Sequence, residues 1–136
     1  MNPDRLFLDA NILFSTAYGS LGLDRLWELQ KKGHCVLLAS RYVIEEAKRN
    51  LTKPKELDKL KACLANVQVV IEADPTLSCP IDLEDKDQPV LMAAISAKAD
   101  YFLTGDIQHF GKYFRHTVMG VRICMARDYL SSKKKS

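Results

Sequence analysis

The sequence is 136 residues long, 47% hydrophobic and 27% charged, a composition typical of a globular domain that buries a core. Its formal net charge of +3 is too small to indicate nucleic-acid binding by itself, and the run Lys133-Lys134-Lys135 accounts for it numerically. No apolar run approaches the ~20 residues of a membrane span, and no secretory signal is recognisable. Four scattered cysteines form no C-x-x-C pair, so we expect reduced thiols in a cytoplasm.

Short apolar segments alternate with amphipathic segments along the chain. The expected strands are residues 6–8, 35–39, 67–71, 100–104 and 117–124. The expected helices begin after Asp9 and after residue 53, and cover residues 23–32, 41–51, 88–97, 109–114 and 126–130. Residues 72–86 contain two prolines and many acids, which predicts a loop. This alternation predicts an α/β fold with a central, mostly parallel five-stranded sheet in one domain over residues 1–131, followed by a disordered basic tail over 132–136.

Asp9 ends the first apolar run, Leu6-Phe7-Leu8, which reads as a strand buried on both faces. The carboxyl end of a central parallel strand is where open α/β sheets bind their ligands. The same position also suits the N-cap of the helix that follows, because Asp is a favoured cap. This stretch alone leaves both interpretations open.

Three other acids are expected near the same edge of the sheet. Asp106 lies just past the strand of residues 100–104, Asp87 at the start of helix 88–97, and Glu46 within helix 41–51. Because right-handed crossovers bring the ends of parallel strands to one edge, Asp9 and Asp106 can meet there, with Glu46 and Asp87 close by. Gathered carboxylates would raise one another's pKa unless a cation neutralised them, and oxygen ligands suit Mg²⁺ or Mn²⁺.

Each of these acids also has an ordinary structural interpretation. Asp87 could be the N-cap of its helix, and Asp85 is a rival for its role as a ligand. Asp106 could be a turn residue. Glu46 could be a solvated helix residue, although it lies closer than Glu45 to the apolar stripe of its helix.

In their order along the chain, four segments resemble the motifs of PIN-domain nucleases. They are Phe7–Leu13, Ser40–Leu51, Lys86–Ala94 and Ala99–Asp106. The chain is most similar to small prokaryotic PIN proteins, a group that includes the VapC-type toxins of toxin–antitoxin pairs. The resemblance implies a three-layer α/β/α sandwich, dependence on Mg²⁺ or Mn²⁺, and hydrolysis of phosphodiesters, typically in RNA. It also implies frequent homodimers and, for toxins, an antitoxin protein as partner.

The resemblance assigns the catalytic and metal-binding acids to Asp9, Glu46, Asp87 and Asp106. Asn11 and Thr104 match its supporting polar positions and would orient carboxylates or water. We expect the three aspartates to hold one or two divalent ions and Glu46 to ligate an ion or to position water. Many toxin members have another acid three positions after the one matched by Asp106, where this chain has His109. That departure bears on the toxin assignment more than on the nuclease assignment.

Basic side chains around an acidic pocket would help to attract a polyanionic substrate. The candidates are Arg41, Lys48, Arg49, Lys112 and Arg115, each of which could equally be an ordinary surface charge.

Three alternatives to a toxin ribonuclease remain open. A phosphatase with an aspartyl nucleophile would need a second Asp in place of Asn11 and a further acid after Gly105-Asp106, and the sequence has neither. A non-catalytic PIN-fold module would bind RNA or protein without cleaving it, although all four matched acids are present. A PIN protein of RNA processing would have the same activity in a housekeeping role.

Overall fold

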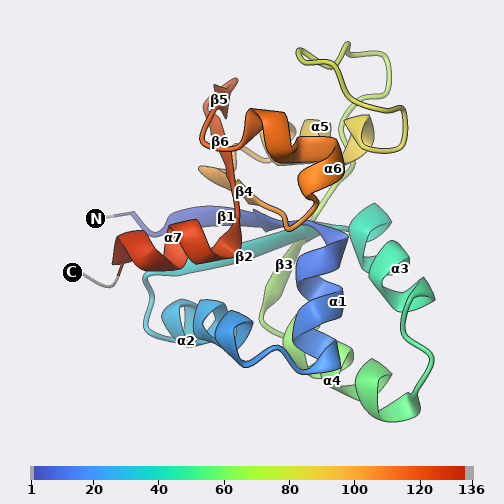
Figure 1. Ribbon diagram of the computed structural model, residues 1–136, viewed down its shortest axis with the longest axis vertical. Coiled ribbons are helices and arrows are strands. Elements are labelled where there is room, and N and C mark those ends of the chain that lie inside the picture. Colours follow the sequence, from blue (N-terminus) through green and yellow to red (C-terminus); the bar gives the residue numbers. More distant parts are fainter. Residues whose placement is uncertain (1, 134–136) are drawn as a thin grey trace.

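The computed structural model describes residues 2–133, and a six-stranded sheet in the order β3-β2-β1-β4-β6-β5 forms its centre (Figure 1). The strands are β1 (Asp4–Leu8), β2 (Cys35–Ser40), β3 (Val67–Val70), β4 (Tyr101–Leu103), β5 (Thr117–Val118) and β6 (Val121–Cys124). All neighbouring strands are parallel except β5 and β6. The predicted α/β fold with a mostly parallel central sheet is confirmed.

The sheet has one strand more than the five expected, because residues 117–124 do not form a single strand. They form an antiparallel hairpin of β5 and β6, in which Val118 pairs with Val121. The two residues between these, Met119 and Gly120, both have positive φ angles, of 50° and 86°. Positive φ at both central residues is the requirement of the type I′ turn that joins two-residue hairpins. Type I′ turns favour Asn, Asp or Gly at the first central position, where this chain has methionine. The sequence therefore predicted a continuous strand.

Seven α-helices are found among residues 2–133. They are α1 (Ala10–Tyr18), α2 (Asp24–Lys31), α3 (Arg41–Arg49), α4 (Pro54–Leu64), α5 (Gln88–Ser96), α6 (Ile107–Phe110) and α7 (Ala126–Lys133). Two 3₁₀ turns, Leu21–Leu23 and Gly111–Tyr113, complete the helical segments. The short helix expected over residues 109–114 is thus divided between α6 and the second of these turns. No helix of this part of the chain could cross a membrane. Residues 132 and 133 continue α7, and the rest of the expected tail lies outside the described residues.

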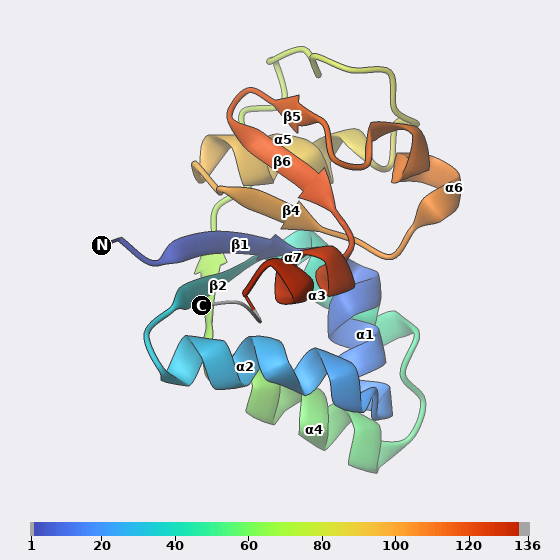
Figure 2. The same cartoon turned by 60° about the vertical axis from the view of Figure 1, so that its left-hand side comes forward.

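Helices cover both faces of the sheet. Tyr101 and Phe102 are consecutive in β4, so their side chains point to opposite faces. Tyr129 of α7 packs on Tyr101 and Phe110 of α6 packs on Phe102, each with ring centroids 4.9 Å apart. In Figure 2, α7 lies in front of the sheet and α5 behind β4 and β6. The result is a three-layer α/β/α arrangement.

The central strands β1 and β4 determine where the site lies. Leu6, Phe7 and Leu8 are fully buried, as expected of a strand covered on both faces. Leu8 pairs in register with Leu103, so both strands end at the same level. The backbone N–H of Asp9 then donates to the Leu103 carbonyl at 3.0 Å. Residues that follow these two strands are therefore adjacent in space.

Candidate metal centre

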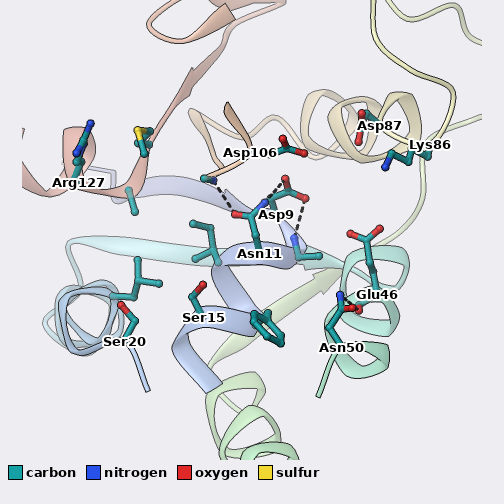
Figure 3. A pocket seen from close by; sticks show the side chains of 17 residues that line it. Asp9, Asn11, Ser15, Ser20, Glu46, Asn50, Lys86, Asp87, Asp106 and Arg127 are labelled. Atoms are coloured by element: carbon teal, nitrogen blue, oxygen red, sulfur yellow. Dashed lines mark hydrogen bonds between the residues drawn. The ribbon is translucent and has the colours of Figure 1, made fainter. Parts of the chain in front are cut away.

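An open cleft of about 790 Å³ lies where β1 and β4 end, and its lining includes Asp9, Glu46, Asp87 and Asp106 (Figure 3). These acids come from the end of β1, the middle of α3, the start of α5 and the end of β4. Asp85, the rival to Asp87, is exposed and does not contribute to this lining. The structure thus brings together four carboxylates that are distant in the sequence.

Asp9 is both a helix cap and a cleft residue. Its Oδ1 accepts a hydrogen bond from the Ala10 N–H at 2.8 Å, at the start of α1. Its Oδ2 accepts from the Thr104 hydroxyl at 2.7 Å and from the Asn11 amide at 3.0 Å. The two interpretations of this residue therefore describe one geometry, because the same carboxylate begins the helix and lies at the cleft.

Burial dominates the electrostatics of Asp9. The residue is only 5% exposed, and loss of solvation raises its pKa from 3.8 to about 6. The negative charge of Glu46 adds to this rise, while the hydrogen bonds from Thr104, Ala10 and Asn11 oppose it. A nearby cation therefore stabilises the charged form of this buried carboxylate more than that of a solvated one.

Thr104 and Asn11 brace the ends of β1 and β4. The buried Thr104 hydroxyl donates to Asp9 and accepts from the Asn11 amide at 3.2 Å and from the Asp106 N–H at 3.1 Å. The Asn11 side-chain oxygen accepts from the Gly105 N–H at 2.8 Å. One hydroxyl, with its single donor and two acceptor positions filled, therefore links Asp9 to Asp106.

Glu46 and Asp87 approach the cleft from the two helices beside it. Glu46 is half-buried on α3, whereas its neighbour Glu45 is exposed and pairs with Lys48 at 3.5 Å. Asp87 precedes α5 but makes no capping hydrogen bond with its side chain. Its pKa is raised by burial, and its Oδ2 is buried with no hydrogen-bond partner among the described residues. Helix capping therefore does not account for the aspartate at this position.

Two tyrosines hold the irregular segment that leads into Asp87. The Tyr42 hydroxyl donates to the Lys86 carbonyl at 3.1 Å, and the Tyr113 hydroxyl donates to the Asp82 carbonyl at 2.8 Å. These contacts attach residues 82–86 to α3 on one side and to the turn after α6 on the other. Neither contact has a signal in the sequence, because each joins residues about thirty or more positions apart.

Asp106 and His109 form a local pair. Asp106 caps α6, since its Oδ1 accepts from the His109 N–H at 3.0 Å. Its Oδ2 lies 2.7 Å from the His109 Nδ1, and this hydrogen bond is the main cause of a raised pKa at His109. The residue that departs from the toxin pattern thus contacts a proposed metal ligand.

The basic residues nearest the acids are not those singled out in the sequence. Lys86 and Arg127 line the cleft, and Figure 3 shows them on opposite sides of the acidic group. The five sequence candidates, Arg41, Lys48, Arg49, Lys112 and Arg115, do not line it. Lys112 lines a separate hollow, and Arg115 lies 3.7 Å from Asp128. Arg127 follows the end of β6, so the edge rule that located Asp9 could also have located it.

The donor set of the cleft fits a divalent cation. Four carboxylates outnumber the two basic side chains in the lining. Burial disfavours the charged form of Asp9, and a buried oxygen of Asp87 has no hydrogen-bond donor in the described part of the chain. A hard divalent ion such as Mg²⁺ or Mn²⁺ takes carboxylate oxygens and would satisfy both.

Comparison with known proteins identifies the family. Among solved structures, that of VapBC2 from Rickettsia felis bound to a DNA fragment from its promoter contains a similar chain, with a TM-score of 0.61 and 15% sequence identity over 88% of this chain and 96% of that one. At this identity the likeness concerns the fold. No match was found among curated proteins. The family model of the PIN domain matches residues 5–108, which is most of the sequence and includes all four acids of the cleft. The chain belongs to the PIN-domain family.

Proposed function

We propose that this protein is a metal-dependent ribonuclease that hydrolyses phosphodiester bonds of single-stranded or structured RNA with Mg²⁺ or Mn²⁺. The observation that carries the proposal is the gathering of Asp9, Glu46, Asp87 and Asp106 around one open cleft. Membership of the PIN-domain family supports the same chemistry.

The acids have distinct proposed roles. Asp9, Asp87 and Asp106 would hold the divalent ion or ions, and Glu46 would complete the ligand set or position the attacking water. The ion would lower the pKa of the attacking water and would neutralise negative charge in the transition state. Thr104 and Asn11 fix the orientation of the Asp9 carboxylate through the hydrogen bonds at 2.7 and 3.0 Å. Such outer contacts keep a ligand in place before the ion arrives.

Lys86 and Arg127 would attract the RNA substrate to the cleft. A cleft with four acids repels a polyanion, and positive charge on both sides of the acids offsets that repulsion. Because these two side chains lie on opposite sides of the acids, we infer that the RNA backbone crosses the cleft from one to the other.

The physiological role we propose is that of the toxin in a toxin–antitoxin pair, acting as a homodimer with an antitoxin partner. The structural likeness to the VapBC2 complex supports this role through the fold. A PIN protein of RNA processing would have the same cleft, so genomic context decides between the two roles. A small gene directly upstream, whose product co-purifies with this protein, is the result expected for a toxin.

The activity is tested with a fluorescently labelled single-stranded RNA, the purified protein and Mn²⁺. Wild type should cleave and Asp9→Asn should not. Two matched pairs sharpen the test: Asp87→Asn should abolish cleavage while Asp85→Asn keeps it, and Glu46→Gln should abolish it while Glu45→Gln keeps it. Equal cleavage by wild type and Asp9→Asn would refute the assigned site. Absence of cleavage, together with absence of Mn²⁺ binding by calorimetry, would indicate a non-catalytic binding module.

A further inference from the structure

His109 faces three carboxylates at once. Its Nδ1 lies 2.7 Å from Asp106 Oδ2 and 3.6 Å from Asp87 Oδ2, and its Nε2 lies 3.3 Å from Glu84 Oε2. One potential ligand atom from each of Glu84, Asp87 and His109 lies within 4.8 Å of the other two. Glu84 does not line the cleft of the four acids, so this group extends beyond the site already described.

The hydrogen bond to Asp106 orients the imidazole. A neutral imidazole has one N–H donor and one acceptor nitrogen. The 2.7 Å contact places the N–H on Nδ1, with Asp106 as its acceptor. Nε2 of the neutral ring then directs its lone pair toward the Glu84 carboxylate 3.3 Å away. Two acceptors at that distance repel unless a proton on Nε2 or a bound cation lies between them. A carboxylate behind the far nitrogen of a histidine is the usual support of a metal-ligating imidazole.

The Asp87 carboxylate, which also lines the cleft, has an oxygen without a hydrogen-bond donor in the described part of the chain. The residue is only 9% exposed, and its Oδ2 is buried without a hydrogen-bond donor among residues 2–133. This is the same oxygen that faces His109. Buried carboxylate oxygens are normally satisfied by hydrogen bonds or by a cation, so the oxygen is oriented as a ligand would be.

We propose that Glu84, Asp87 and His109 form a divalent-cation position with a nitrogen ligand beside the carboxylate cleft, and that it takes Mn²⁺ or Zn²⁺ in preference to Mg²⁺. The preference follows from the imidazole, because nitrogen ligands suit transition metals whereas Mg²⁺ binds through oxygen. The inference rests on the proposed function in one respect, since Asp87 is a proposed ligand in both. It requires neither RNA nor cleavage.

The test uses Mn²⁺ alone and the full-length protein. Pulsed EPR of bound Mn²⁺ detects a coordinated imidazole through the modulation caused by its nitrogen-14 nucleus. We expect this modulation in wild type and its loss in His109→Gln, with retention in His34→Gln and His116→Gln, which alter the other two histidines of the chain. Glu84 is 62% exposed in its side chain, so Glu84→Gln should fold normally and bind this Mn²⁺ at least about 10-fold more weakly.

Two additions make failure unambiguous. Asp9→Asn should keep the nitrogen modulation while losing RNA cleavage, so absence of cleavage with intact modulation would count against the proposed function alone. Zn²⁺ should displace the nitrogen-coupled Mn²⁺ at a lower concentration than Mg²⁺ does. Absence of nitrogen modulation in wild type, its persistence in His109→Gln, its loss in Asp9→Asn, or equal displacement by Mg²⁺ would overturn the inference.

Discussion

Ionisation of Asp9 should destabilise the ion-free protein, and Asp9→Asn should remove that effect. Burial raises the pKa of Asp9 from 3.8 to about 6, so between these pH values the folded state holds a proton that the unfolded state has released. The contribution of Asp9 to stability is therefore full below the unfolded value and is lost as the pH rises through about 6. The difference between the two pKa values of Asp9, 3.8 and about 6, corresponds to about 3 kcal/mol of stability in full.

Urea denaturation of wild type and Asp9→Asn at about pH 4 and about pH 7 measures this quantity. The variant keeps one oxygen to cap α1 but loses the second acceptor at both pH values, at a cost of ~1 kcal/mol or more, and this cost cancels in the comparison. The difference in the free energy of unfolding should move by about 2 kcal/mol in favour of the variant between pH 4 and pH 7, because at pH 4 the unfolded carboxyl is already partly ionised. Addition of Mg²⁺ at pH 7 should stabilise wild type more than the variant. A difference that stays constant with pH would refute the reasoning.

Other predictions concern the bracing hydroxyl and the basic rim. Thr104→Val removes the donor to Asp9 and should lower the free energy of unfolding by ~1–3 kcal/mol and Mn²⁺ affinity by ~10-fold or more, by denaturation and calorimetry, whereas Thr104→Ser should keep most of both. In a non-cleaving Asp9→Asn background, Lys86→Met and Arg127→Met should each reduce the salt dependence of single-stranded RNA binding, measured by fluorescence anisotropy, by a slope of about 0.7. Lys112→Met, outside the cleft, should leave that slope unchanged, and an equal effect of all three would contradict the proposed path.

Local patterns in the sequence predicted the elements that position the acids. The apolar run of residues 6–8 predicted a buried strand, and the edge rule for parallel sheets then placed the residues after β1 and β4 side by side. The register of Leu8 with Leu103 fulfils that expectation. Helical periodicity predicted that Glu46 lies nearer the core than Glu45 does. In the structure Glu46 is half-buried and Glu45 is exposed.

Features that depend on tertiary contacts could not be predicted in this way. The positive φ of Met119 is stabilised by pairing of β5 with β6 and has no local signal. Lys86 comes to the cleft through the Tyr42 hydroxyl bond to its carbonyl, across forty-four positions of sequence. His109 appeared in the sequence only as a departure from a pattern, and its contacts with Glu84 and Asp87 needed the packing of α6 against the start of α5.

If this cleft activates water to hydrolyse RNA, the oxygen of that water must enter the product. Mass spectrometry of RNA cleaved by wild type in water enriched in oxygen-18, with Mg²⁺ present, measures this. Hydrolysis by water puts one oxygen-18 atom into the phosphate of the product and leaves no cyclic phosphate. We expect labelled phosphate from wild type and no labelled product from Asp9→Asn. A 2′,3′-cyclic phosphate without label would show attack by the ribose hydroxyl and would exclude hydrolysis by water activated in the cleft.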